Sequence, residues 1–265
     1  MATQKIQHFF HPQSGTISYV ISDKNTKEAV IIDPVADYNA AENKVSFESA
    51  QEIEKYISKN SLHVSAILET HVHADHLSGS FYLSKRMNAP IHVSDKVKEV
   101  YSAWKDELGL SEMYHFEHYL LDQEHLEFGD SDLEVIRTPG HTSSDVTYKI
   151  GDALFVGDTL FHHGTGRSDF PGGGAGDLFE SIAKLYQMSD NTEVYLCHNY
   201  PKDQEHLVYK TSIGEEKHDN DFLSDCTSKA EFVDKRQHRD EQLAAPKLIN
   251  QALKYNLTAT PPEAL

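Results

Sequence analysis

The chain has 265 residues, of which 38% are hydrophobic and 25% are charged. This balance is typical of a globular protein and excludes an intrinsically disordered chain. The formal net charge of −18, with histidines neutral, disfavours nucleic acid and anionic membrane surfaces as partners. The two cysteines, Cys197 and Cys226, are too few for a disulfide framework.

The N-terminal segment and the apolar runs bear on location. Residues 1–10 carry polar and basic side chains and lack a long apolar core, so they do not resemble a signal peptide. The sequence has no stretch near the roughly 18 apolar residues that a transmembrane helix needs. We therefore expect a cytoplasmic protein that binds neither membrane nor nucleic acid.

Short apolar runs bounded by turn residues dominate the first two-thirds of the chain. In chain order they predict strands over residues 16–21, 29–32, 64–68, 90–93, 126–128, 133–137, 146–150, 153–156 and 193–196. Apolar residues at helical spacing predict helices over residues 47–60, 77–87, 97–108 and 178–188, and a polar helical tail over 229–255. Strands mixed with helices in this way favour an α/β fold of two sheets layered between helices.

A cluster of metal-binding side chains follows the predicted strand over residues 64–68. The segment His-Val-His-Ala-Asp-His places His71, His73, Asp75 and His76 within six positions. A loop at the end of a strand stands on a rigid base, so its side chains can converge on one ion. A solvated loop with a helix cap at Asp75 would explain one such residue but not four. The cluster therefore predicts a metal site.

Further candidate ligands recur just after later strands. His141 lies in Thr-Pro-Gly-His-Thr after residues 133–137, Asp158 lies in Gly-Asp-Thr after 153–156, and His198 follows 193–196. Each residue alone has an ordinary explanation as a turn or core residue. Their recurrence at the same place relative to a strand indicates that the loops share one site.

Taken in order, these motifs resemble those of the metallo-β-lactamase superfamily over about residues 16–200. The resemblance implies an αββα sandwich, with two mixed β-sheets between layers of helices. Residues 70–79, 138–142 and 166–170 look like those of the persulfide dioxygenases, the group that includes the ethylmalonic encephalopathy protein. Residues 170–173 and the tail after His198 look like the bacterial branch of that group.

This resemblance implies one non-haem Fe(II) ion per chain. Its catalytic ligands would be His71, His141 and Asp158, a set of two histidines and one carboxylate. The implied reaction is the oxidation of glutathione persulfide by O₂ to sulfite and glutathione. The other motif residues would surround these ligands or form a second metal site: His73, Asp75, His76 and His198.

Two further residues are candidates for substrate binding. Glutathione carries two carboxylates, so an acidic protein needs local cations to hold it, and Arg167 is placed for this by its motif. A brace between Arg167 and Asp169 is an equal alternative. Tyr200 is expected to donate a hydrogen bond to the substrate or to a metal-bound group. Asn199 stands where the family commonly has aspartate, so a charge beside His198 is lost.

A binuclear zinc hydrolase resembling glyoxalase II is the alternative function. Two Zn²⁺ ions and a bound hydroxide would then cleave a glutathione thioester. Residues 166–170 favour the dioxygenase over this hydrolase. An exported, antibiotic-degrading β-lactamase is disfavoured because no signal segment is recognised. The hydrolase would place His71, His73 and His141 on one ion, Asp75, His76 and His198 on the other, and Asp158 between them.

Residues 1–265 are expected to form a single domain, with residues 201–265 as a helical extension packed on it. A homodimer interface is the alternative role for this extension. Cys197 is expected to be a buried structural cysteine rather than a redox-active one. His162 and His163, which closely follow Asp158, are interpreted as ordinary loop or strand residues.

Overall fold

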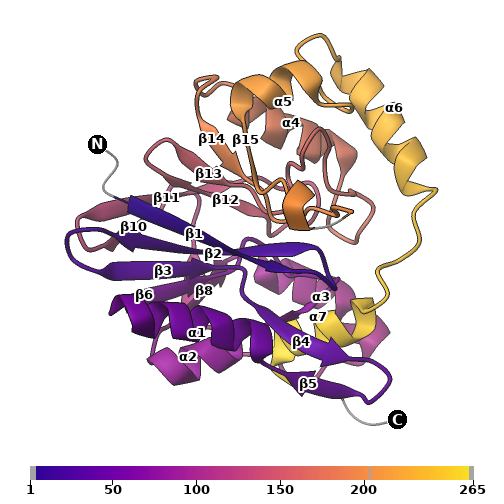
Figure 1. Ribbon diagram of the computed structural model, residues 1–265. Helices are drawn as coiled ribbons and strands as arrows, with labels where there is room; N and C mark the ends of the chain where they lie inside the picture. Colours follow the sequence, from indigo (N-terminus) through magenta and orange to yellow (C-terminus); the bar gives the residue numbers. More distant parts are fainter. Residues whose placement is uncertain (1–3, 203, 263–265) are drawn as a thin grey trace.

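The computed structural model describes residues 4–202 and 204–262. Two six-stranded mixed sheets lie against each other, and helices cover the outer face of each sheet (Figure 1). The strand order is β1-β2-β3-β6-β8-β9 in the first sheet and β10-β11-β12-β13-β14-β15 in the second. The expected α/β sandwich is therefore confirmed.

The first sheet consists of β1 (Gln4–His11), β2 (Thr16–Asp23), β3 (Glu28–Ile32), β6 (His63–Leu68), β8 (Ile91–Ser94) and β9 (His118–Leu120). The second consists of β10 (His125–Phe128), β11 (Ser131–Arg137), β12 (Val146–Ile150), β13 (Ala153–Phe155), β14 (Glu193–Tyr195) and β15 (Lys210–Ser212). A small third sheet joins β5 (Lys44–Ser46), β4 (Val35–Asn39) and β7 (Leu77–Ser78).

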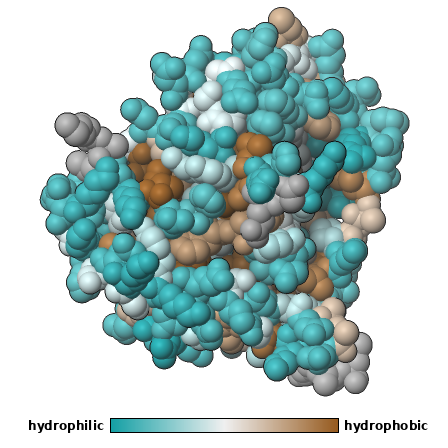
Figure 2. Space-filling model, viewed as in Figure 1, coloured by the Kyte–Doolittle hydropathy of each residue, from teal (hydrophilic) through white to brown (hydrophobic). Residues whose placement is uncertain are grey.

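The helices are α1 (Glu48–Asn60), α2 (Ser80–Met87), α3 (Val97–Leu108), α4 (Ala175–Leu185), α5 (Ile213–Asp219), α6 (Lys229–Asp240) and α7 (Ile249–Thr258), with a 3-10 turn at Gln204–His206. In residues 4–202 and 204–262, each helix is too short or too polar to cross a membrane. The face seen in Figure 2 is mostly hydrophilic, in keeping with the net charge of −18.

Side chains that alternate between two buried faces explain why the inner strands are continuous apolar runs in the sequence. In β2, Tyr19 points into the core between the sheets, whereas Val20 points toward α1. In β3, Ile32 likewise packs in the core between the sheets, and Ile31 packs on the side of α1. A strand buried on both faces needs apolar residues at nearly every position, which makes it easy to recognise from sequence.

The sequence missed elements that are polar or short. β1 was not predicted, yet it pairs with β2 along its whole length, from Gln4 opposite Asp23 to His11 opposite Thr16. Its strand conformation comes from that pairing, because its own pattern is not apolar. β4, β5, β9, β15 and α5 were missed for similar reasons. Residues 77–78 form β7 rather than the start of α2, and the predicted tail helix is interrupted between α6 and α7.

The C-terminal segment contacts both halves of the sandwich. Phe232 of α6 packs with α4 in the cluster outside the second sheet. Leu253 and Leu257 of α7 pack with Trp104 of α3 on the side of the first sheet. Figure 1 shows the connection between α6 and α7 passing from one half to the other. The segment therefore lies along the edge where the two sheets meet.

Candidate metal centre

Loops after β6, β11, β13 and β14 bring the predicted ligands together at one edge of the sandwich. One nitrogen of His71, one nitrogen of His141 and one oxygen of Asp158 all lie within 4.8 Å of one another. Nε2 of His141 is 3.6 Å from Oδ2 of Asp158. The structure thus places the three residues expected to hold iron in one group that could hold an ion.

The other motif residues lie next to this group. His73, Asp75 and His76 form a second set whose ligand atoms lie within 4.8 Å of one another. Nε2 of His198 is 3.4 Å from Oδ1 of Asp158 and 3.7 Å from Oδ2 of Asp75. All seven predicted residues therefore share one neighbourhood, although they come from four separate loops.

Hydrogen bonds orient the two histidines of the first set. Nδ1 of His141 lies 2.8 Å from the carbonyl oxygen of Arg167, which fixes the proton on Nδ1 and leaves Nε2 to face Asp158. Nδ1 of His71 lies 3.0 Å from the Thr70 hydroxyl. Burial and then the neighbouring histidines His73 and His141 lower the pKa of His71 well below its usual value. A neutral imidazole with a free Nε2 is the form that binds a metal.

Buried polar atoms without partners test whether the site fits a metal. Among the described residues, Asp75 Oδ2, His76 Nε2, Asp158 Oδ1 and His198 Nδ1 are buried and make no hydrogen bond. Such atoms are rare in folded proteins because each costs desolvation free energy. Their concentration around one cluster of nitrogen and carboxylate donors fits a metal ion.

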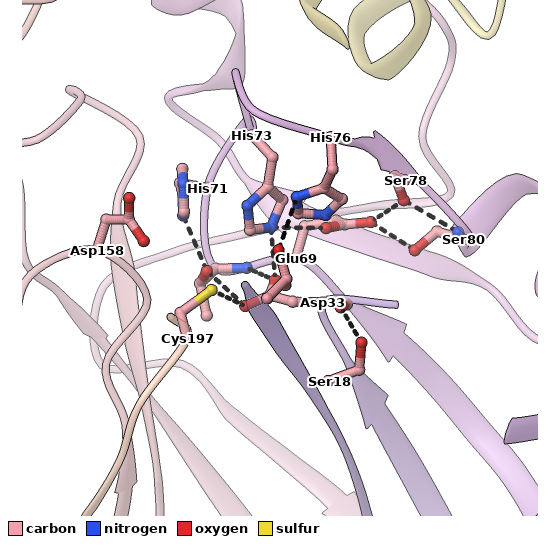
Figure 3. A network of polar contacts seen from close by, with 12 residues as sticks. Ser18, Asp33, Glu69, His71, His73, His76, Ser78, Ser80, Asp158 and Cys197 are labelled. Carbon is pink, nitrogen blue, oxygen red and sulfur yellow. Dashed lines mark hydrogen bonds and ion pairs between the residues drawn. The ribbon is translucent and has the colours of Figure 1, made fainter. Parts of the chain in front are cut away.

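His73 is held differently, by two buried carboxylates (Figure 3). Its Nε2 is 3.1 Å from Oδ1 of Asp33 and 3.4 Å from Oε2 of Glu69. Burial alone would lower the pKa of His73, but Asp33 and Glu69 raise it well above its usual value. Through Nε2, His73 is therefore engaged in an ion-pair network, while its Nδ1 is buried and makes no hydrogen bond among the described residues.

Two residues that hold the loop of residues 70–76 in place were not predicted from the sequence. Asp33 accepts hydrogen bonds from the Thr70 backbone nitrogen and hydroxyl, at 2.7 and 2.8 Å. Asn256 of α7 donates to the carbonyl oxygens of His73 and His76, both at 2.9 Å. The sequence did contain a signal for Asp33, which directly follows the predicted strand over residues 29–32. That strand, β3, is the parallel neighbour of β6, so the two strands end at the same edge of the sheet. Asn256 lies far along the chain in a polar tail and had no such signal.

Gly140 allows the loop after β11 to pack closely against α4. Gly140 has a φ of 147°, in a region that L side chains rarely adopt. A Cβ atom on it would lie only 2.3 Å from the Cα atom of Leu178 in α4. The Pro-Gly-His motif thus uses its glycine for close approach to α4, and this fixes the position of His141.

An open pocket of about 500 Å³ leads to the cluster of candidate metal ligands. This volume is within the range of sites for small-molecule ligands, about 300–1,000 Å³. His141, Asp158 and His198 lie at its inner end. Its walls include aromatic side chains and three arginines: Phe161, Phe170, Tyr200, Phe222, Arg167, Arg236 and Arg239.

The two residues predicted to bind substrate both line this pocket, but they differ in availability. Arg167 is engaged by Asp169, with its Nε and Nη2 atoms 2.6 and 2.7 Å from the two carboxylate oxygens. Its Nη1 donates to the carbonyl of Ala244 at 2.8 Å. The structure thus places Arg167 in the brace, the alternative given above. Tyr200 is 74% exposed, and its ring lies parallel to that of His198.

The pocket's other two arginines differ in the same way. Arg236 is buried and paired with Asp240 at 2.7 Å. Arg239 is exposed, and its side chain makes no hydrogen bond or ion pair within the part of the chain that the structure describes. Of the three arginines that line this pocket, Arg239 is therefore the one available to bind an anionic group. It was not predicted from the sequence.

Asn199 and Cys197 both have structural contacts. The side-chain oxygen of Asn199 accepts a hydrogen bond from the Val208 backbone nitrogen at 3.1 Å. The aspartate-to-asparagine change therefore falls on a loop contact. Cys197 is buried, and burial, followed by the nearby carboxylates Asp33 and Asp158, raises its pKa well above the usual value. A protonated, buried thiol agrees with the structural role expected for Cys197.

Comparison with known proteins gives the chain a family. The model of the metallo-beta-lactamase superfamily matches residues 13–198. The chain is 36% identical to the "Beta-lactamase hydrolase-like protein" of Xylella fastidiosa, covering 96% of this chain but 60% of that relative. It is also 36% identical to "Glyoxylase B2" of Dictyostelium discoideum, over 96% of this chain and 90% of the relative. The chain thus spans about three-fifths of the length of the Xylella protein.

Persulfide dioxygenases are also among the relatives. The chain is 29% identical to "Persulfide dioxygenase ETHE1, mitochondrial" of Bos taurus, over 97% of this chain and 90% of the relative. The crystal structure of ETHE1 from Myxococcus xanthus superposes with a TM-score of 0.78 and 29% identity, covering 95% and 97% of the two chains. The chain belongs to the metallo-beta-lactamase superfamily, and within it the chain is a homologue of the persulfide dioxygenase ETHE1.

Proposed function

We propose that the protein is a persulfide dioxygenase that uses one Fe(II) ion per chain to oxidise glutathione persulfide. The grouping of the candidate ligands carries this proposal. His71, His141 and Asp158 form one set of possible ligands, whereas His73 belongs to other sets: with Asp75 and His76, with Cys197 and His198, or with Asp33 and Glu69. Two histidines and one carboxylate with open positions are typical of non-haem Fe(II) oxygenases. The similarity to ETHE1 supports the same activity.

When bound, Fe(II) supplies the O₂ chemistry and open positions for a soft sulfur donor. The overall reaction consumes one persulfide, one O₂ and one water, and yields one thiol, one sulfite and two protons. The terminal sulfur is oxidised, O₂ is reduced, and the sulfur–sulfur bond is broken. Water supplies the third oxygen of sulfite.

The chain's own residues hold the ligands and shield the reacting sulfur. The Arg167 carbonyl and the Thr70 hydroxyl fix the ring orientations of His141 and His71. Phe170 lies against His141, with 5.3 Å between ring centroids, and Phe161 lies against His198 at 5.9 Å. These aromatic rings limit the access of water to the inner end of the pocket, where the persulfide would bind.

Arg239 is expected to hold a carboxylate of glutathione, because the other two arginines of the pocket are already paired. Replacing Arg239 with alanine should raise the KM for glutathione persulfide about tenfold, the loss of roughly one charge-assisted hydrogen bond. The kcat should change less than about twofold, because Arg239 is not one of the candidate metal ligands and would hold a part of the substrate that does not react. Steady-state oxygen uptake measures both constants.

Arg86→Ala is the matched control for Arg239. Arg86 is an exposed arginine of α2 that pairs with Glu54 at 2.6 Å and lies outside the pocket. Its removal should leave the KM unchanged. An unchanged KM in Arg239→Ala as well would contradict the assignment of Arg239 to substrate binding.

A binuclear zinc thioesterase is the second candidate. His73, Asp75 and His76 form a further set of donors beside the first, and a relative named as a glyoxylase supports this alternative. In the hydrolase His73 would have to join His71 and His141 on one ion. Its Nε2 faces Asp33 and Glu69, while its Nδ1 is buried and makes no hydrogen bond among the described residues, so metal content distinguishes the two candidates.

Metal content and oxygen uptake distinguish the two candidates. Protein purified and reconstituted without oxygen should contain one iron per chain. With glutathione persulfide, an oxygen electrode should record one O₂ consumed for each sulfite formed. Two zinc ions per chain, together with hydrolysis of a glutathione thioester and no oxygen uptake, would instead establish the hydrolase.

A further inference from the structure

Two adjacent histidines near the pocket face one glutamate. His162 and His163 occupy the tight turn between Phe161 and Gly164, whose backbones exchange hydrogen bonds of 2.9 and 3.1 Å. The two imidazole rings are stacked, with 3.9 Å between their centroids. Oε1 of Glu215, in the first turn of α5, lies 3.5 Å from Nε2 of each histidine. The three side chains therefore converge on a common point.

The distances within this group suit shared metal ligands better than hydrogen-bond partners. A contact of 3.5 Å is long for a hydrogen bond between an imidazole and a carboxylate. Two donors that each lie about 2.0–2.1 Å from a tetrahedral ion are about 3.3 Å apart. Ligand atoms of the three residues all lie within 4.8 Å of one another. Among the described residues, Nε2 of His163 is buried and makes no hydrogen bond.

The turn is fixed in place by α5 and by the residues that follow it. The backbone nitrogen of His163 donates to both carboxylate oxygens of Glu216, at 3.1 and 3.2 Å. The His163 carbonyl accepts from the Asp221 backbone nitrogen at 3.1 Å. His163 has a φ of 55°, and a left-handed backbone at a residue other than glycine persists only where its surroundings enforce it. The backbone that carries the two rings is thus held in position before any ligand arrives.

We propose that His162, His163 and Glu215 form a separate binding site for a divalent transition-metal ion such as Zn²⁺. Two imidazoles and a carboxylate are suitable zinc ligands, and three protein ligands leave a coordination position open. The side chains are 30%, 35% and 44% exposed, so an ion can enter from solvent. His162 also lines the catalytic pocket, which places the ion at the rim of that pocket.

This site shares no ligand with the group of His71, His141 and Asp158, so it does not depend on the proposed function. Equilibrium dialysis against graded Zn²⁺, followed by elemental analysis, tests it. The wild-type protein should bind one more zinc per chain than the His162→Ala/His163→Ala variant. His125→Ala removes an exposed histidine that contacts Asp132 at 2.7 Å, and it should match the wild type. Equal zinc content in the wild type and the double variant would overturn the proposal.

Three further measurements keep the test decisive if the double variant does not fold. Glu215→Gln retains the shape of the side chain and should weaken zinc binding at this site by at least about tenfold. His71→Ala, which alters the other site, should keep this zinc. Crystals of the wild-type protein soaked in Zn²⁺ should show an anomalous peak about 2.0–2.2 Å from the three side chains. Crystals without a peak there, or unchanged affinity in Glu215→Gln, would refute the site.

Discussion

Replacement of His71 with alanine is expected to reduce the iron content from one per chain to nearly none and to lower oxygen uptake by at least about 1,000-fold. His71 supplies one of only two imidazoles in its ligand set, and its partners cannot move to replace it. Nδ1 of His141 is tied to a backbone carbonyl, and the loop of His71 is anchored through Thr70 to Asp33. Elemental analysis and an oxygen electrode measure the two effects.

His73→Ala is the informative companion to His71→Ala. If His73 serves only to support the site, its removal should retain one iron per chain and lower activity about 10- to 100-fold, as is usual for residues that orient metal ligands. A binuclear centre predicts that both variants lose a metal ion to the same extent. Equal loss of metal and activity in the two variants would therefore contradict the mononuclear proposal.

Asp33→Asn is expected to lower the stability of the folded protein more than substitution of any of its exposed charged residues. The carboxylate is buried, contacts Nε2 of His73 at 3.1 Å and accepts two hydrogen bonds from Thr70. Removing one member of a buried ion pair costs about 3–5 kcal/mol, because the other charge is left without compensation. Urea unfolding of metal-free protein should show this decrease in the free energy of unfolding.

Asp132→Asn is the matched control. Asp132 also contacts a histidine, His125, at 2.7 Å, but both side chains are more than half exposed. Water screens such a pair, so its removal should cost at most about 1 kcal/mol. Similar losses in the two variants would show that burial does not strengthen the Asp33–His73 contact.

The effect of Asp33→Asn should also depend on pH. Asp33 has a lowered pKa in the folded state, despite the opposing effect of burial, because His73 and Thr70 stabilise its charge. Its stabilisation is present above the unfolded value of 3.8 and is lost as the pH falls. The raised pKa of His73 stabilises fully below the unfolded value of 6.5, and this is lost as the pH rises through the folded value. The difference between wild type and variant should therefore be greatest between these two unfolded values.

The parts of the fold that could be predicted are those whose local pattern agrees with their place in the structure. β2, β3, β12 and α3 were recognised because their apolar residues match the burial that these elements have. β1 could not be recognised in the same way, since it is partly exposed and owes its conformation to pairing with β2. Elements that depend on a neighbour carry little signal of their own.

The candidate site likewise has parts that the sequence predicted and parts that it could not predict. His71, His73, Asp75 and His76 were found because they lie close together in one loop, and His141, Asp158 and His198 because each follows a strand. The roles of the surrounding residues could not be predicted. For Arg167 the sequence left substrate binding and a brace with Asp169 open, and the structure shows the brace. Arg239 lies in no motif, so its place in the pocket could not be predicted.

The sequence by itself thus determined that this protein has an α/β sandwich with a cluster of metal-binding side chains, since both features are written in local patterns of residues. Only the tertiary structure decided which side chains of the cluster lie close to one another. It groups His71, His141 and Asp158 as one set of possible metal ligands and places Nε2 of His73 against Asp33 and Glu69. It also brings Asp33 and Asn256 to the loop of residues 70–76 from distant parts of the chain. It also sets His162 and His163 against Glu215, an arrangement that sequence spacing does not encode. The physical reason is that ligand sets and ion pairs depend on distances between loops, and folding of the whole chain fixes those distances.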